Sequence, residues 1–209
     1  MIQSEIDESK GFTFNSGLRA MLRQDPDVIM VGEIRSEETL DTATSASLTG
    51  HLVFSTLHTK SAAETLDRLL NMGMKPYIMA SALDTIIAQR LVRKLCPHCK
   101  QTREKTRTEE HLISDMMHEI GMHSVSIDHI NLYKPGECDK CKNTGYSGRI
   151  GLFEIISLDD EMRDLIRSSA PVSTIIASAR HKDFISMKED GILKAMRGYT
   201  TIEEILRVL

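Results

Sequence analysis

Short apolar segments alternate with amphipathic stretches through the first half of the chain. Residues 28–31 (VIMV) form a continuous apolar run, and residues 51–58 (HLVFSTLH) form a second predicted strand. Both are typical of strands that are buried on two faces of a parallel sheet. Between and beyond them, apolar spacing and capping residues predict helices over 14–24, 36–48 and 61–70. This alternation predicts an α/β fold with a parallel sheet.

The same signals divide the second half of the chain. Pro76 fits the first turn of a helix that is expected to run to about Leu95. Polar and charged residues dominate 100–137, which holds one predicted helix over 109–120. A strand is predicted over 148–156. Three or four short helices follow, and their expected starts are Asp159, Ser173, Ser186 and Thr201.

Composition restricts the class of protein. Apolar residues make up 41% of the chain and charged residues 27%, as in ordinary globular proteins. No apolar run is long enough to span a bilayer, and the acidic opening MIQSEIDESK is unlike a secretory leader. We therefore expect a cytoplasmic protein. A net charge of −4 and the absence of Trp disfavour a general nucleic-acid binder, which needs a basic surface.

All four cysteines of the chain stand in two CxxC pairs, Cys96 with Cys99 and Cys138 with Cys141. Each pair can present two thiolates on one side of a tight turn, and two such turns close a tetrahedral zinc site. Reducing conditions in the cytoplasm favour metal binding over disulfides. Zinc is the leading interpretation. A disulfide or redox pair, and a site without metal, are the alternatives.

Glu33 follows the apolar run 28–31 and a glycine. A carboxylate there lies at the carboxyl end of a buried parallel strand, where ligands bind in open α/β sheets. Its desolvation needs a compensating cation or hydrogen-bond donor. One interpretation is a Walker B acid that holds magnesium or polarises the attacking water of nucleotide hydrolysis. The other is a surface glutamate that is paired with Arg35.

Two histidines and two arginines add to this candidate site. His51 and His58 bracket the second predicted strand, and His58 is expected on the same sheet edge as Glu33. A histidine there could position or sense a phosphate, although a hydrogen-bonded structural histidine is the commoner case. Arg19 and Arg23 stand four apart on one predicted helix, where like charges cost about 0.2–0.5 kcal/mol. A bound anion would remove that penalty, and so would simple solvation.

The known phosphate-binding loops have no match in the chain. No G-x-x-x-x-G-K-[ST] sequence occurs among the 209 residues. Gly145, Gly148 and Gly151 do not form a dinucleotide-binding fingerprint, because no strand precedes them in the required way. The residues alone therefore supply no loop that wraps phosphates with backbone N–H groups.

The segment from GFTFNSGLRAMLRQDPDVIMVGEIR to TGHLVFSTLHT resembles the GspE/PulE/PilB family of secretion ATPases, the motors of type II secretion and type IV pilus assembly. The similarity continues through IIAQRLVRKLCPHCK, CDKCKNTGYSGRIGLFEII and TTIEEILRVL, and so covers essentially the whole chain. It implies ATPase activity, with ATP, Mg²⁺ and Zn²⁺ as cofactors. The implied fold is α/β: the C-terminal part of a RecA-like P-loop NTPase sheet, a four-cysteine zinc module and a small helical bundle.

The resemblance also implies a role for each candidate residue. Glu33 matches the Walker B acid of the family, and His51 and His58 match its His box. Four arginines fall where the family has arginines that reach nucleotide phosphates or neighbouring subunits; these are Arg19, Arg23, Arg35 and Arg68. The residues that match the zinc ligands are Cys96, Cys99, Cys138 and Cys141.

Three domains are expected from this resemblance. They are a partial RecA-like ATPase domain over 1–95, a zinc-binding module over 96–141 and a C-terminal strand with a helical domain over 142–209. The phosphate-binding loop and the Asp box of the family have no counterpart in the chain. We therefore expect a C-terminal fragment of a motor, inactive on its own.

The family resemblance implies a homo-hexamer on the cytoplasmic face of the inner membrane. There it drives a platform protein of the secretion or pilus machine, touches the membrane only through partners and binds no nucleic acid. The alternative is a truncated, non-catalytic, zinc-bearing interaction module of the same machinery. Secretion, pilus assembly and DNA uptake are not separated by the sequence.

Overall fold

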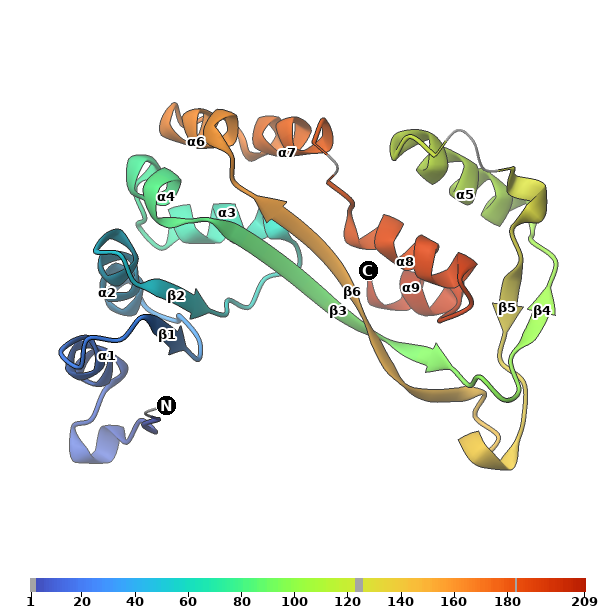
Figure 1. Cartoon of the computed structure of the whole chain (residues 1–209), viewed down its shortest axis with the longest axis horizontal. Coiled ribbons are helices and arrows are strands. Elements are labelled where there is room, and N and C mark those ends of the chain that lie inside the picture. The colour runs from blue at the N-terminus through green and yellow to red at the C-terminus, as the bar shows by residue number, and fades with distance from the viewer. Residues whose placement is uncertain (1–2, 123–125, 183) are drawn as a thin grey trace. The chain divides into compact units, whose positions relative to one another are not determined.

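The computed structural model describes residues 3–122, 126–182 and 184–209. Residues 123–125, inside the predicted polar stretch 100–137, lie outside this description. The chain forms two compact units: unit 1 comprises Met1–Ile86 and Ser157–Ala179, and unit 2 comprises Ile87–Ile156 and Arg180–Leu209. The elements follow one another along the chain as Figure 1 shows. The three domains that were expected from the sequence stay a prediction.

Unit 1 is built around two parallel strands, β1 (Val28–Val31) and β2 (Leu52–Ser55). Val28 lies opposite Leu52, and Val31 lies opposite Ser55. This confirms the predicted α/β fold with parallel pairing. The helices of the unit are α1 (Phe14–Leu22), α2 (Glu37–Leu48), α3 (Ala62–Asn71), α4 (Pro76–Ala82), α6 (Asp160–Arg167) and α7 (Val172–Arg180), with the short 3₁₀ turn η1 (Glu8–Lys10) before them.

Hydroxyl and carboxylate caps set where α1, α2, α3 and α6 begin. Thr13 caps α1 through a reciprocal pair of hydrogen bonds with Ser16, and Ser36 accepts a hydrogen bond from the Thr39 N–H at the start of α2. Ser61 caps α3 and Asp159 caps α6 in the same way. Such caps satisfy N–H groups that a helix leaves without an internal partner. The predicted starts of these helices are therefore confirmed to within a few residues.

The burial of β1 and β2 differs from the prediction of two fully buried strands. Ile29 and Val31 are buried, and α2 packs against β2. On the opposite face, Val28, Met30, Leu52 and Phe54 are each more than half exposed. A groove of about 1040 Å³ is lined by residues 3–6, by α1 and by β1, and Val28 and Met30 belong to its lining. An apolar run identifies a strand, but it does not say how many of its faces are covered by the chain itself.

The prediction of one helix from Pro76 to about Leu95 is wrong beyond Ala82. Helix α4 ends at Ala82, where Arg163 Nη1 donates to the carbonyls of Ala80 at 2.5 Å and Leu83 at 2.7 Å. Strand β3 (Thr85–Leu95) follows. Buried and exposed residues alternate along much of it, as in a half-buried strand. Its β-branched residues Thr85, Ile86, Ile87 and Val92 favour that conformation.

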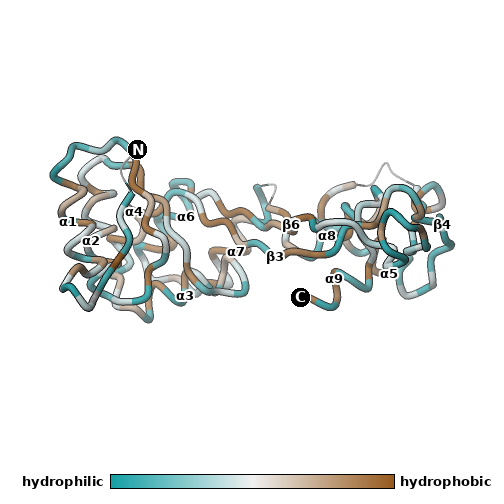
Figure 2. Tube along the Cα trace, turned by 90° about the horizontal axis from the view of Figure 1, so that it is seen from below, coloured by the Kyte–Doolittle hydropathy of each residue, from teal (hydrophilic) through white to brown (hydrophobic). Residues whose placement is uncertain are grey.

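Strands β3 and β6 (Tyr146–Ser157) form a long two-stranded ribbon. Figure 1 shows their arrowheads pointing in opposite directions, and Figure 2 shows apolar positions along both. The remaining elements of unit 2 are β4 (Gln101–Arg103), α5 (Arg107–Glu119), η2 (Ile127–His129), β5 (Leu132–Lys134), η3 (Asp139–Cys141), α8 (Met187–Met196) and α9 (Ile202–Val208). Strands β4 and β5 pair antiparallel and were not predicted.

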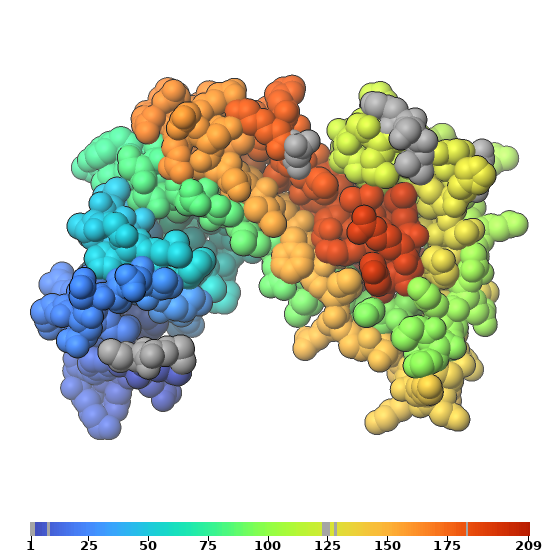
Figure 3. All heavy atoms as spheres, in the orientation of Figure 1, coloured from blue at the N-terminus to red at the C-terminus, as the bar shows by residue number. Residues whose placement is uncertain are grey.

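The core of unit 2 joins these elements. Val92, Leu132, Leu152 and Ile205 are each at most 1% exposed. Helix α8 packs against β5 and α9, and Figure 3 shows the side chains of α8 and α9 (red) against the yellow-green segment of the unit. Among the described residues, no helix combines the length and the apolar character that a membrane crossing requires.

A buried carboxylate ties α9 to this core. Glu204 is 3% exposed, and its carboxylate accepts hydrogen bonds from Arg93 at 2.5 Å and from Arg207 at 2.9 Å. The Arg93 guanidinium also lies 4.2 Å from the centre of the Tyr146 ring. Arg90, Arg93 and Lys94, which would end the helix that was expected to run to about Leu95, all lie on β3.

Candidate catalytic edge and metal centre

The carboxyl ends of β1 and β2 lie at the same edge of the sheet, because the two strands are parallel. Two hydrogen bonds join the loops that leave them. The Thr56 hydroxyl donates to the Gly32 carbonyl at 2.6 Å, and the Ile34 N–H donates to the Thr56 carbonyl at 3.1 Å. The residues that follow each strand are therefore held side by side. Thr56 was not singled out from the sequence, since a lone threonine after a strand carries no distinct signal.

This edge brings Glu33 and His58 together, as predicted. Oε2 of Glu33 lies 3.0 Å from Nε2 of His58, and Oε1 lies 2.6 Å from Arg35 Nη2. The side chain of Glu33 is 25% exposed, while those of His58 and Arg35 are 85% and 77% exposed. The carboxylate is thus anchored at the edge, with both partners on its solvent side. The pairing of Glu33 with Arg35 is therefore present, and the interpretation of Glu33 as a Walker B acid stays a prediction.

The charge state of Glu33 follows from these contacts. The Arg35 hydrogen bond is the main cause that lowers its pKa below the ordinary value, and His58 contributes in the same direction. Desolvation acts against them and is outweighed. Glu33 is therefore an ionised acceptor at neutral pH. Such a group can orient a water molecule or bind a cation.

The other predicted residues of this site lie elsewhere in unit 1. His51 precedes β2, at the end of the strand opposite to His58, and its Nδ1 lies 2.9 Å from the Ala46 carbonyl. Arg19 is exposed on α1, where its Nε donates to the Asn15 side chain at 3.2 Å. Arg23 is exposed at the C-cap of α1, and Arg68 is exposed on α3. The structure does not bring these four side chains to Glu33.

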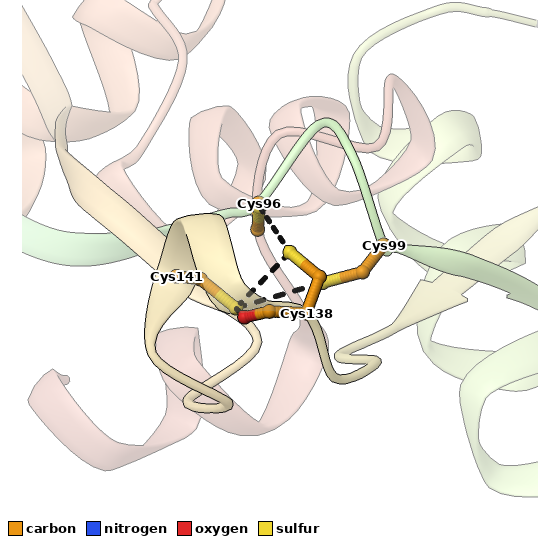
Figure 4. Close-up of side chains that lie close together, drawn as sticks. All are labelled: Cys96, Cys99, Cys138 and Cys141. Carbon is orange, nitrogen blue, oxygen red and sulfur yellow. Dashed lines mark hydrogen bonds between the residues drawn. The ribbon is translucent and has the colours of Figure 1, made fainter.

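A second candidate site lies in unit 2, where the four cysteines converge. Cys96 and Cys99 come from the turn after β3, and Cys138 and Cys141 come from the turn around η3. Figure 4 shows the four side chains turned toward one another. Their sulfur atoms all lie within 4.8 Å of one another, and three of the pairs are separated by 3.6, 3.7 and 3.8 Å.

These distances fit a tetrahedral zinc ion. With zinc–sulfur bonds of about 2.3 Å, the edges of a sulfur tetrahedron are about 3.8 Å long. Disulfide bonds are far shorter, at about 2.05 Å. All four cysteines are free thiols, two of them buried. The residues therefore fit zinc and leave no open ligand position, which is typical of structural sites.

The four thiols also perturb one another. Burial and the neighbouring sulfurs of Cys138, Cys141 and Cys96 raise the pKa of Cys99 to about 12. Burial would raise the pKa of Cys141 as well, but the hydrogen bond from the Gly145 N–H, the backbone of Cys138 and the thiols of Cys138 and Cys99 together outweigh it and lower that pKa to about 6. A thiol cluster of this kind releases protons readily when a cation is bound at its centre.

Comparison with known proteins identifies the family. The profile of a family described as "Type II/IV secretion system protein" matches residues 1–207. The chain belongs to this family. The resemblance that was inferred from the GEIR, His-box and cysteine motifs is confirmed by a match over nearly the whole chain.

Relatives within the type II/IV secretion system protein family include pilus and secretion ATPases. The chain is 46% identical over 206 residues to the type IV pilus assembly ATPase PilB of Pseudomonas aeruginosa, covering 99% of the chain and 35% of that protein. It is 42% identical to the type II secretion system ATPase E of Vibrio cholerae, covering 99% of the chain and 39% of that protein. The chain therefore spans little more than a third of the length of these relatives.

Solved structures share the fold. The pilus retraction motor PilT with bound ADP superposes with a TM-score of 0.63 at 25% identity, covering 94% of this chain and 43% of PilT. The ATPase DotB of Legionella pneumophila gives a TM-score of 0.64 at 23% identity, over 98% of this chain and 44% of DotB. The fold of the chain is thus that of part of an ATPase of this kind.

Proposed function

We propose that the chain is a working part of a motor ATPase that drives type II secretion or type IV pilus assembly. The contact between Glu33 and His58, 3.0 Å apart at the carboxyl ends of two parallel strands, is the observation that carries the proposal. That edge is where open α/β sheets bind ligands. The family match and the ATPase relatives support ATP hydrolysis as the reaction at this edge.

The proposed reaction is hydrolysis of the terminal phosphoryl group of ATP. Catalysis of phosphoryl transfer depends mainly on positioning and on electrostatic stabilisation. In this mechanism the ionised Glu33 accepts a hydrogen bond from the attacking water and orients it. His58, which contacts Glu33 through Nε2 and is mostly exposed, turns its Nε2–H from the carboxylate to the γ-phosphate when nucleotide binds. Magnesium, when bound, supplies charge neutralisation at the phosphates.

The arginines of unit 1 supply positive charge in this proposal. Arg35 is mostly exposed and balances Glu33 before nucleotide binds. Arg19, Arg23 and Arg68 are exposed and free to contact phosphates or a neighbouring subunit, as the family resemblance implies. His51 is more simply explained by its 2.9 Å contact with the Ala46 carbonyl, which fixes the start of β2. We retain it as a member of the His box without a direct catalytic step.

The four cysteines hold one structural zinc ion in the proposed motor. Zinc, when bound, supplies the cross-link that joins the end of β3 to the start of β6. The proposed assembly is a homo-hexamer on the cytoplasmic face of the inner membrane, where it acts on a membrane platform protein. The printed names of the relatives, which belong to pilus assembly and type II secretion, support this setting.

A non-catalytic interaction module is the second candidate function. It is favoured by one observation: the 209 residues contain no G-x-x-x-x-G-K-[ST] loop. Hydrolysis by the proposed motor therefore needs phosphate-binding groups from outside these residues. Both candidates predict no hydrolysis by the isolated chain, so only a longer protein separates them.

A chimeric ATPase tests the proposed function. In it, this chain is substituted for the matched 35% of P. aeruginosa PilB, to which it is 46% identical. We expect the chimera to hydrolyse ATP at a rate within about tenfold of the unmodified ATPase, because the catalytic edge is complete. A chimera that folds and binds ATP but shows no turnover would support the interaction module and contradict the motor.

A further inference from the structure

One glycine joins the two halves of the cysteine cluster. The Gly145 N–H donates a hydrogen bond to the sulfur of Cys141 at 3.3 Å, and the Gly145 carbonyl accepts one from the Cys96 N–H at 2.9 Å. Cys141 belongs to the second CxxC pair and Cys96 to the first. Gly145 is therefore bonded to both pairs at once, through its two backbone polar groups.

No side chain can replace the hydrogen at this position without displacement of the backbone. A Cβ on Gly145 would lie 2.3 Å from Cβ of Pro135 and 2.8 Å from the Gly136 carbonyl oxygen. The φ angle of Gly145 is +74°, in the region that strains every L-residue. The segment before the second cysteine pair thus packs directly on the backbone of Gly145.

Gly136 extends this close contact to the first cysteine pair. A Cβ on Gly136 would lie 2.0 Å from the Cys99 carbonyl oxygen. Gly136 therefore packs against Cys99 of the first pair, and Gly145 packs against Pro135. Neither glycine leaves room for a side chain. These backbone contacts restrict the spacing between the two pairs.

We propose that Gly145 is a positioning residue for the metal, holding the two cysteine pairs at the separation that a tetrahedral ion requires. This inference rests on the proposed zinc site. Gly145 touches the ligands Cys96 and Cys141 but supplies no ligand atom itself. Groups of this kind, which orient metal ligands through hydrogen bonds, typically change metal affinity by about 10- to 100-fold when removed.

Gly148 provides a matched control three residues away. Its φ angle is +73°, so an alanine there meets the same backbone strain as at Gly145. A Cβ on Gly148 would have no neighbour within 4 Å. Gly148 lies on β6, and the structure records no contact between Gly148 and the four cysteines. A difference between Gly145→Ala and Gly148→Ala therefore reports the close packing and the two hydrogen bonds of Gly145, not the strain alone.

The experiment is a cobalt(II) titration of the whole chain, followed by zinc competition. The wild type is expected to bind one Co²⁺ with intense thiolate-to-cobalt absorption. Gly148→Ala is expected to bind within about threefold of the wild type, and Gly145→Ala at least about tenfold more weakly, with shifted cobalt bands. Equal affinities for the two variants would overturn the inference and leave the zinc site intact. A wild type that binds no cobalt would overturn the zinc site itself.

A second measurement needs no variant and so does not depend on whether Gly145→Ala folds. In the wild-type chain loaded with ¹¹³Cd, a hydrogen bond from an amide to a metal-bound sulfur transmits a scalar coupling between the amide proton and the metal. We expect such a coupling for the amide of Gly145 through Cys141. A cadmium-loaded protein whose Gly145 amide shows no coupling would refute the proposed contact.

Discussion

At the scale of single residues, parallel strands made the candidate site predictable. Glu33 and His58 each follow a predicted strand, and parallel strands bring their carboxyl ends to one edge. The pairing of Arg35 with the same carboxylate was also foreseen, but as an alternative. The buried ion pairs were not predicted, because their partners are distant in sequence: Arg93 and Glu204 are separated by 111 positions.

The buried carboxylate of Glu204 predicts a pH dependence of folding. Hydrogen bonds from Arg93, and then from Arg207, lower its pKa from 4.5 to about 2, against the effect of burial. A carboxylate whose pKa is lowered by folding stabilises the folded state at pH values above its unfolded pKa. That contribution is lost as the pH falls from about 4.5 toward 2, and it is on the order of 2 kcal/mol after allowance for the exposed arginines.

Urea unfolding at pH 7 and pH 3 measures this contribution. We expect Glu204→Gln to lower the free energy of unfolding at pH 7 and to lose less between pH 7 and pH 3 than the wild type. Glu110→Gln, at an exposed position on α5, is the control and is expected to follow the wild type. If Glu204→Gln keeps the full pH dependence of the wild type, the assignment to Glu204 is wrong.

At the scale of elements, helix starts were predicted well and the β3 strand was not. Caps such as Ser36, Ser61 and Ser186 are local signals, so they can be found in the sequence. Residues 85–95 fit either a helix or a half-buried strand by apolar spacing. Pairing with β6, about 60 residues later, makes this segment a strand. The local sequence gives no sign of that distant partner. The same limit applies to the short β4–β5 pair.

Helix α8 closes the outer edge of β6 with two side chains. Asp190 Oδ2 accepts the Phe153 N–H at 2.8 Å, and Lys194 Nζ donates to the Gly151 carbonyl at 2.8 Å. The two side chains also pair with each other. Together they occupy the hydrogen-bonding positions that a further strand would use. Uncovered strand edges invite pairing between molecules.

We therefore predict that the double change Asp190→Ala with Lys194→Ala makes the chain self-associate through β6. Analytical ultracentrifugation should show a concentration-dependent dimer, and hydrogen exchange at the Phe153 amide should quicken in the monomer. Asp190→Asn is the matched control, because it keeps an acceptor for Phe153 while weakening the ion pair, and it should stay as monomeric as the wild type. A double variant with unchanged mass and unchanged Phe153 exchange would contradict this.

At the scale of the whole molecule, the two candidate sites fall in separate compact units. The Glu33 edge lies in unit 1, and the four cysteines lie in unit 2. The cysteine spacing predicted the metal site from the sequence, because two CxxC pairs carry their own geometry. The exposure of Val28, Met30, Leu52 and Phe54 was not predicted, since the sequence pattern of a strand does not state what covers it.

Metal removal should act on one unit. Structural zinc contributes directly to folding, because its ligands come together only in the folded chain. We expect about one zinc ion per chain, and we expect a chelator to speed hydrogen exchange across 96–141 while α2 and α3 of unit 1 keep their protection. Metal analysis of the purified chain that finds no zinc, or a chelator effect spread equally over both units, would contradict the prediction.

The most direct test of the account is the effect of Glu33→Gln on ATP turnover in the PilB chimera. The change removes the negative charge and keeps the size of the side chain. We predict that turnover falls by at least about 100-fold, while ATP binding stays within a few-fold of the unmodified chimera and Glu110→Gln has no effect. Turnover that is unchanged by Glu33→Gln would remove this carboxylate from the mechanism and contradict the proposed catalytic edge.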